Sequence, residues 1–349
     1  RPVILDAGGG FTDGNGADVL NISSSTLEMR AVTGIGVGVA NDAGDIDTTI
    51  TGTFAGQTTS GDIHLHNVGG LTIGALTTLS GAQITGGAVG DDITIRAASP
   101  MTVNSSVLNS GGGDITLASE GNTAADDLIL AADVTASGGN GNVRLFAGHD
   151  VLHNSGTITA AGSGDISVSA GEDFAGGTNQ AGNADGDVRM VDGLVIQSGS
   201  GLITLEATRD VVLSTVTTMG NVTVSADDDD FTLADNVGSI TEVLTGEAEN
   251  ISGMALDLAA STGIGTGATL DDAGDIDISG TTLSAVNSTS GTINITELDS
   301  VALASISNPG RPVILDAGGG FTDGNGADVL NISSSTLEMR AVTGIGVGV

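Results

Sequence analysis

The sequence predicts an all-β protein. Its expected fold is a right-handed parallel β-helix, or solenoid, with about 20–22 residues per coil, continuous through residues 1–349. Three observations lead to this prediction. A 39-residue segment occurs twice without change, a short glycine-led strand motif recurs along the chain, and helical patterns with capping residues are nearly absent.

The repeated segment sets the domain organisation. Residues 1–39 return unchanged at 311–349, an offset of 310 residues. We therefore expect residues 1–310 to be one full period of the solenoid and residues 311–349 to be the start of the next identical period. Stacked repeats bury their apolar faces against their neighbours, so an array can outgrow a single core. Val349 is accordingly expected to lead into the sequence that follows Val39.

The strand motif consists of Gly, then usually Asp or Asn, then two apolar residues separated by one other residue. Examples are GDIHLH from Gly61, GDITLA from Gly113 and GDISVS from Gly164, and most neighbouring motifs lie 17–23 residues apart. Alternation of apolar and polar residues is typical of a half-buried strand, and Gly with Asp favours a turn before it. The residues expected to point inward are Ile115, Leu117, Ile166, Val168, Val222 and Val224.

Other architectures fit this spacing less well. The strands of a β-sandwich are not spaced so regularly along the sequence, and a propeller needs about 40–50 residues per blade. Residues 124–134 are compatible with a helix, but the apolar run at 128–130 between turn residues favours a strand. With about 4.8 Å between coils, one period would hold about 14–15 coils and advance roughly 70 Å.

An older duplication lies inside the period. TGIGVGVANDAGDID from Thr33 matches TGIGTGATLDDAGDID from Thr262 with one inserted residue, and TSGDIHLH from Thr59 matches TSGTINIT from Thr289. Residues 21–76 and 250–306 are therefore diverged copies. Their strands are expected to occupy equivalent coil positions.

Composition limits the function. The chain has 8 Arg, no Lys and 43 acidic residues, for a net charge of −35. Such a polyanion should repel nucleic acid and favour cations or basic partners. There is no apolar run of 18 residues, so no membrane insertion is expected in this segment. Without Lys there is no P-loop, no G-x-S-x-G elbow occurs, and the chain is not expected to be an enzyme.

Aspartates provide the candidate metal sites. The run at 227–230 and the two DAGDID segments cluster carboxylates beside turns, and Ca²⁺ prefers six to eight oxygen ligands. Calcium is the one cofactor that these aspartates suggest, and it would bridge filaments that otherwise repel each other. The expected ligands are Asp227, Asp228, Asp229, Asp230, Asp45, Asp47, Asp275 and Asp277. The alternative is a solvated acidic surface.

Polar residues on strands offer weaker candidates. His64 and His66 are two apart and should share the outer face, either as exposed polar residues or as a metal pair, and the exposed interpretation also covers His149 and His153. Several Asn residues begin an N-x-Ser/Thr triplet, and inward Asn ladders are an equally good use for them. These residues are Asn21, Asn104, Asn221, Asn250, Asn287, Asn294 and Asn331.

The sequence pattern of the chain resembles the repetitive passenger regions of bacterial filamentous-haemagglutinin-like and autotransporter-like surface proteins. The segments that carry this resemblance are GDITLAS, GLTIGAL, TGIGTG and VILDAGG. The resemblance implies a right-handed parallel β-helix, an extracellular or cell-surface location, and structural or adhesive roles. We expect a structural shaft of a giant surface or matrix filament whose main partner is itself. The alternative is an adhesin whose repeats bind a host, cell or glycan ligand. A polysaccharide-active enzyme of the same fold is the third option.

Overall fold

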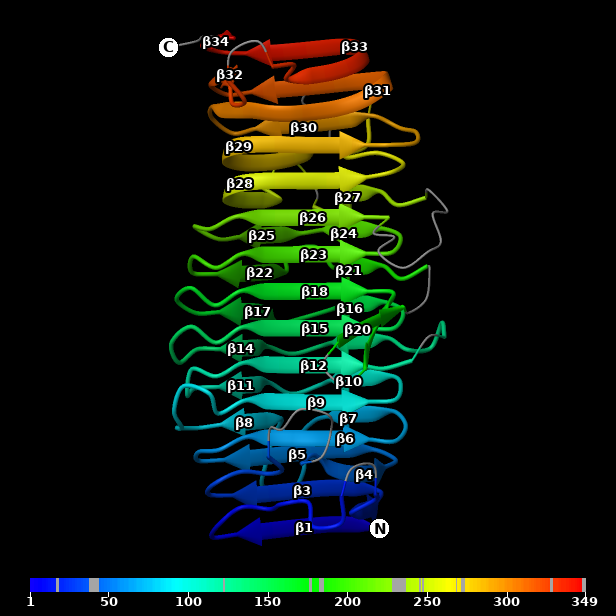
Figure 1. Ribbon diagram of the computed structural model, residues 1–349, viewed down its shortest axis with the longest axis vertical. Helices are drawn as coiled ribbons and strands as arrows, with labels where there is room; N and C mark the ends of the chain where they lie inside the picture. The colour runs from blue at the N-terminus through cyan, green and yellow to red at the C-terminus, as the bar shows by residue number, and fades with distance from the viewer. Residues whose placement is uncertain are drawn as a thin grey trace. The chain divides into compact units, whose positions relative to one another are not determined.

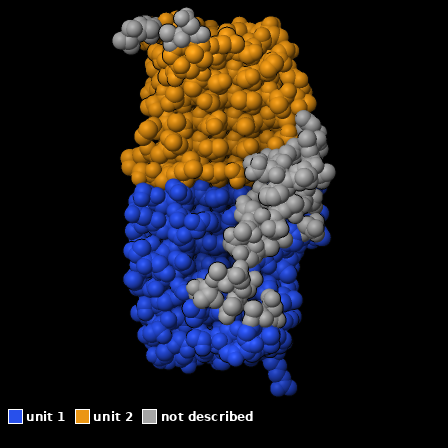
Figure 2. Space-filling view, in the orientation of Figure 1, with its two compact units in different colours: residues 1–186, 197–199 blue, residues 187–196, 200–349 orange. Residues whose placement is uncertain are grey.

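A computed structural model gives the arrangement of most of the chain. It describes all residues except 17–18, 38–43, 122, 176–177, 182–184, 228–236, 245, 247, 268, 271–273, 327–328 and 347–349. The chain divides into unit 1, residues 1–186 and 197–199, and unit 2, residues 187–196 and 200–349 (Figure 2). The described residues contain no α-helix, and hence no helix that could cross a membrane.

The strands are short in unit 1 and longer toward the end of unit 2 (Figure 1). Unit 1 holds β1 (Pro2–Ala7), β2 (Ile22–Ser24), β3 (Thr26–Ala31), β4 (Ile46–Ile50), β5 (Thr53–Thr58), β6 (Ile63–Asn67), β7 (Leu71–Ile73), β8 (Ala82–Ile84), β9 (Ile93–Ala97), β10 (Met101–Val103), β11 (Val107–Asn109), β12 (Ile115–Ser119), β13 (Leu128–Leu130), β14 (Val134–Ala136), β15 (Val143–Ala147), β16 (Val151–His153), β17 (Thr157–Ala160), β18 (Ile166–Ala170), β19 (Glu172–Ala175) and β20 (Thr178–Ala181). Unit 2 holds β21 (Val188–Met190), β23 (Ile203–Ala207), β24 (Val211–Leu213), β25 (Thr215–Thr217), β26 (Val222–Ala226), β27 (Ile240–Glu242), β28 (Ile251–Ala260), β29 (Ile276–Asn287), β30 (Ile293–Glu297), β31 (Val301–Ala317), β32 (Gly320–Asp323), β33 (Ile332–Ala341) and β34 (Gly344–Ile345). The residues of β22 (Val195–Ser198) are divided between the two units.

Strands of successive coils pair in parallel, which confirms the predicted parallel β-solenoid within each unit. In unit 1, β6, β9, β12, β15 and β18 form one column, and β7, β10, β13 and β16 form a second. A third column contains β8, β11, β14 and β17. The apolar segment at 128–130 is a strand, as predicted, whereas β19 and β20 form a separate antiparallel pair.

The core is a set of stacked inward side chains. Ile115 pairs with Ile93 below and Val143 above, and all three side chains are fully buried. Because the strands alternate, every second residue of β12 enters such a stack. All six residues predicted to point inward, namely Ile115, Leu117, Ile166, Val168, Val222 and Val224, are buried.

The aspartate of the strand motif extends the main-chain ladder. In unit 1 the amide of Asp92 donates to Asp62 Oδ1 at 2.9 Å, and the amide of Asp114 donates to Asp92 Oδ1 at 2.8 Å. Asn142 and Asp165 continue the series, each donating its amide at 2.8 Å to the side-chain oxygen one coil below. The side chain thus provides the acceptor that a coil's first amide needs. This explains why Asp or Asn precedes so many of the strands.

The glycine of the motif has a conformational reason. Gly61 has a φ of +73° and the equivalent Gly291 a φ of +85°, a region that favours glycine. At Gly61 a Cβ would also collide with the carbonyl of Thr33 in the coil below. The motif therefore combines a left-handed turn with a close approach between backbones.

Coil length varies more than the predicted 20–22 residues. The hydrogen-bonded ladder residues of unit 1 lie 22, 23, 28 and 30 positions apart. Those of unit 2 lie 23, 27 and 29 positions apart. The added residues are in the turns between strands, which differ in length from coil to coil. One period therefore holds fewer coils than the motif spacing suggested.

The diverged copies adopt equivalent positions, as predicted. In unit 1 the Asp47 amide donates to Asn21 Oδ1 at 2.7 Å, and in unit 2 the Asp277 amide donates to Asn250 Oδ1 at 2.9 Å. Parallel bridges also correspond, joining residues 35 and 63 in one copy and 264 and 293 in the other. Unit 2 can therefore be compared with unit 1 residue by residue.

Candidate functional site

Arg96 is a buried cation on the outer face of unit 1. It lies in β9 between Ile95 and Ala97, which point into the core, so its guanidinium points outward. Nη2 donates to Asp45 Oδ2 at 3.0 Å and Nη1 donates to Glu120 Oε1 at 3.1 Å. A buried charge is tolerated when it is paired in this way. The two ion pairs connect residues that are 51 and 24 positions away from Arg96.

The histidines of β6 complete this cluster. His64 and His66 share the outer face as predicted, but they are partly buried rather than exposed. His64 Nδ1 lies 3.5 Å from Asp45 Oδ1, and His66 Nδ1 lies 3.3 Å from Asp47 Oδ1. His66 Nε2 lies 3.6 Å from Glu120 Oε2, and the nearby Glu120 carboxylate is the main cause that raises the pKa of His66. We call the set the outer-face network: Asp45, Asp47, His64, His66, Arg96 and Glu120.

The diverged copy in unit 2 keeps the aspartates and loses the basic residues. Asp275 and Asp277 occupy the aspartate positions, whereas Asn294 and Thr296 occupy the histidine positions. The Thr296 hydroxyl donates to Asp275 Oδ2, and Asn294 Nδ2 donates to the Thr266 carbonyl at 2.9 Å. At the positions of the two histidines, unit 2 therefore has hydrogen bonds from neutral side chains in place of ion pairs.

A cavity of about 400 Å³ opens beside Asp277 in unit 2. Glu249, Thr296 and Asp316 line it, together with Arg340, which forms an ion pair with Asp316. An acidic cavity of this kind is suited to a cationic group.

The predicted calcium ligands fall into two classes. Asp45, Asp47, Asp275 and Asp277 are all buried and take part in the hydrogen bonds described above, so they lie within the fold rather than on a free lateral surface. Asp227 is half-buried, and its amide donates to the Arg209 carbonyl at 3.1 Å. Asp228, Asp229 and Asp230 lie outside the described residues. Calcium binding by these aspartates stays a prediction.

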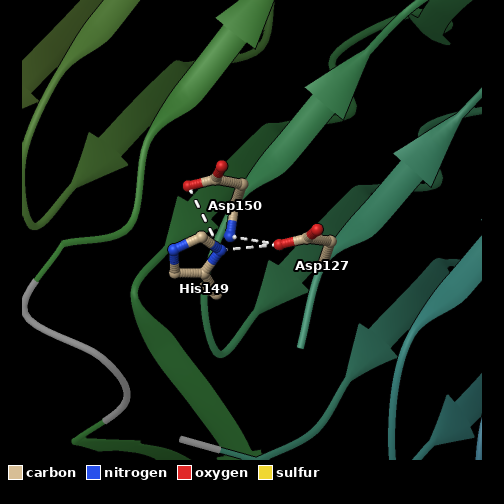
Figure 3. A group of neighbouring side chains, drawn as sticks. All are labelled: Asp127, His149 and Asp150. Carbon is tan, nitrogen blue, oxygen red and sulfur yellow. Dashed lines mark hydrogen bonds and ion pairs between the residues drawn. The ribbon is translucent and has the colours of Figure 1, made fainter. Parts of the chain in front are cut away.

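Unit 1 contains a second cluster, which the sequence analysis missed (Figure 3). His149 Nδ1 lies 2.7 Å from Asp127 Oδ1 and 3.5 Å from Asp150 Oδ1. These are the only three His, Asp or Glu residues of the described chain whose ligand atoms all lie within 4.8 Å of one another. Burial opposes protonation of His149, but the three carboxylates around it, of Asp127, Asp150 and Asp185, outweigh it and raise its pKa.

His153 corrects one sequence expectation. It was expected to be an exposed polar residue, but it points inward at the end of β16 and is fully buried. Nε2 lies 3.0 Å from the Gly156 carbonyl, and burial lowers the pKa of the imidazole. His153 thus pairs in register with Leu130 and serves as a core residue.

Among the seven asparagines considered above, Asn287 takes part in an inward ladder, which was one of their two predicted uses. Asn250 and Asn294 are also buried, but Asn294 lies at the outer-face position equivalent to His64. Asn287 Nδ2 donates to Asn308 Oδ1 at 3.0 Å, and Asn308 Nδ2 donates in turn to the Pro312 carbonyl at 2.6 Å. These side chains satisfy the backbone groups of the inner turns.

Comparisons with known proteins leave the family open. No protein-family model, no curated protein and no solved structure matches the chain.

Proposed function

We propose that the chain is a structural repeat segment, the shaft of a giant secreted bacterial surface or extracellular-matrix filament. In this proposal its main partner is another stretch of the same array. The resemblance to filamentous-haemagglutinin-like passenger regions belongs to the same proposal. The support comes from how the repeated segment packs.

The two identical segments adopt the same strand register. Val3 pairs with Leu27 in unit 1, and Val313 pairs with Leu337 in unit 2. Each pair joins the first strand of its segment to the strand one coil above. A segment that keeps the same strand register at both places is suited to tandem use.

One observation carries the proposal. Leu27 pairs in register with Val3 in the coil below and with Phe54 in the coil above, and it is 0% exposed. A residue of the repeated segment is therefore buried between two neighbouring coils. In a stacked array, the stability of each repeat depends in this way on the interfaces with its neighbours.

The charge of the chain supports an extended filament. A net charge of −35 is spread over coils whose cores are apolar. Like charges at the surface repel neighbouring filaments within a Debye length, about 10 Å at 0.1 M salt. Filaments of this kind would stay separate unless cations or basic partners join them.

Direct ligand binding is the second candidate function, favoured by one groove in unit 2. Met219 and Met254 are 73% and 55% exposed and line a groove of about 440 Å³ with Thr281 and Ser300. Two exposed methionines beside hydroxyl groups offer both apolar and polar contacts to a ligand. In this reading each period would present one copy of the groove.

Surface display of chains with one, two and four periods separates the candidates. For a shaft, the distance of a terminal tag from the cell surface should grow by one fixed increment per period. Binding to cells and glycans should stay unchanged. For an adhesin, binding should rise with the number of periods and fall when Met219 and Met254 are both changed to Ser. Tags that stay at one distance would contradict the shaft.

A further inference from the structure

We propose that Asp127, His149 and Asp150 of unit 1 bind a divalent transition-metal ion of the zinc class. The proposal is independent of the shaft function. It rests on how two neighbouring coils bring these three side chains together (Figure 3).

The solenoid register creates the convergence. Leu128 opens β13 and pairs with Val151, which opens β16 one coil above. Asp127 and Asp150 immediately precede these residues, so they occupy the same ladder position, and the Asp150 amide donates to Asp127 Oδ1 at 3.2 Å. His149 precedes Asp150 and turns its ring toward both carboxylates. Two coils thus provide three ligand atoms.

The ligand types favour zinc over calcium. One imidazole nitrogen and two carboxylate oxygens match the ligands that Zn²⁺ accepts at about 2.0–2.2 Å. Calcium prefers six to eight oxygens, and a single imidazole does not suit it. The present separations from Nδ1, 2.7 Å to Asp127 and 3.5 Å to Asp150, fit ligands around one ion after small side-chain rotations. Water would complete the coordination.

The three ligand side chains are only partly buried, so an ion can reach them from solvent. The side chains of His149, Asp127 and Asp150 are 14%, 23% and 16% exposed. The ligands are therefore held by the surrounding fold, yet each side chain keeps part of its surface exposed to solvent. An ion held there would join two coils through side chains as well as through the backbone ladder.

A fourth residue orients the ring. His149 Nε2 lies 3.7 Å from Asp185 Oδ1, on the side opposite the two ligand carboxylates. In metal sites the second nitrogen of a ligating histidine usually faces a carboxylate, a backbone carbonyl or a water molecule, which fixes the tautomer and the ring plane. A metal at Nδ1 would displace to solvent the proton that now faces Asp127 Oδ1, while Nε2 would keep its proton on the side of Asp185. This arrangement is a second observation that points to a metal ligand rather than a simple ion pair.

The test is titration of the full chain with Zn²⁺ by calorimetry and by competition with a chromogenic chelator. We expect one ion per chain at this site. His149→Ala should weaken binding at least a hundredfold, and Asp127→Asn, which keeps the side-chain size, at least tenfold. His64→Ala is the matched control, because His64 also lies beside an aspartate on the outer face of unit 1. The Zn²⁺ affinity of the His64→Ala variant should equal that of the wild type.

Cobalt provides an independent readout. Co²⁺ bound at the site should give visible absorption bands in the wild type and in His64→Ala but not in His149→Ala or His149→Gln. Circular dichroism of each variant checks that the solenoid is intact. Equal zinc affinity of His149→Ala and the wild type would overturn the proposal. So would binding weaker than millimolar, or a preference for Ca²⁺ over Zn²⁺.

Discussion

Asn67 and Glu297 are equivalent residues of the two diverged copies, and both point into the core. Asn67 Oδ1 accepts a hydrogen bond from the Ile50 amide at 2.7 Å, and Glu297 Oε2 accepts one from the equivalent Gly280 amide at 3.3 Å. Asn67 also donates its side-chain amide to the Gly69 carbonyl at 3.0 Å. A glutamate at this position can act as a neutral acceptor and donor, as asparagine does, only if its carboxyl group keeps its proton.

Burial enforces this protonation. It raises the pKa of Glu297 from 4.5 to about 8, although the backbone amides of Asp299 and Gly280 act in the opposite direction. The folded state therefore holds a proton that the unfolded chain releases at lower pH. As the pH rises from 4.5 to about 8, the contribution of Glu297 to the free energy of unfolding should fall by about 1.4 kcal/mol per pH unit, and this contribution should level off above that range.

Glu297→Gln should remove this pH dependence. Glutamine supplies a neutral acceptor and donor at all pH values, so the variant should be more stable than the wild type at pH 9 and similar to it near pH 4.5. Denaturant unfolding across that pH range measures the difference. Glu338→Gln is the control, because Glu338 is exposed in the same unit. Parallel pH profiles for the wild type and Glu297→Gln would contradict the buried acid.

Arg96→Ala should destabilise unit 1 by about 3–5 kcal/mol, because it leaves Asp45 and Glu120 beside a vacated, buried position. Arg144→Ala should cost less than about 1 kcal/mol, since the Arg144 side chain is 41% exposed and its partner Asp114 is 30% exposed. Urea unfolding of both variants provides the comparison. Similar losses for the two would mean that the outer-face network is not a buried ion-pair system.

Ile166→Asp should cost about 4 kcal/mol or more, because it combines the loss of a core side chain with an unpaired buried charge. Ser167→Asp places the same charge on the outward position of β18 and should cost less than about 1 kcal/mol. Hydrogen exchange should locate the damage in the coils next to β18, since repeats couple mainly to their neighbours. Protection that is lost uniformly over unit 1 would contradict this local response.

The fold was predictable because the apolar pattern of each strand is local. Ile115 and Leu117 stand two apart after a glycine and an aspartate, and the structure stacks both in the core. His153 follows the same alternation as Val151, so its inward position could have been inferred from β16. Coil length was less predictable, because turns of different length join strands of the same pattern.

The clusters could not be predicted from composition alone. Arg96 meets Asp45 across 51 positions, and that meeting depends on the lengths of two intervening coils. For Asp127 and Asp150 a signal was present, since each aspartate directly precedes an apolar strand. Aligning those strands would have placed Asp127 and Asp150 in neighbouring coils, with His149 directly before Asp150.

The axial repeat of a chain with several periods, measured by electron cryo-microscopy, tests the central claim most directly. Residues that pair between neighbouring coils of unit 1 lie 19–30 positions apart, so a period of 310 residues should hold about 12 coils. At about 4.8 Å per coil the repeat should advance about 60 Å along the axis. An axial repeat near 60 Å with a 4.8 Å coil spacing is the predicted result. A repeat near 30 or 120 Å, or the absence of the coil spacing, would contradict a stacked solenoid shaft.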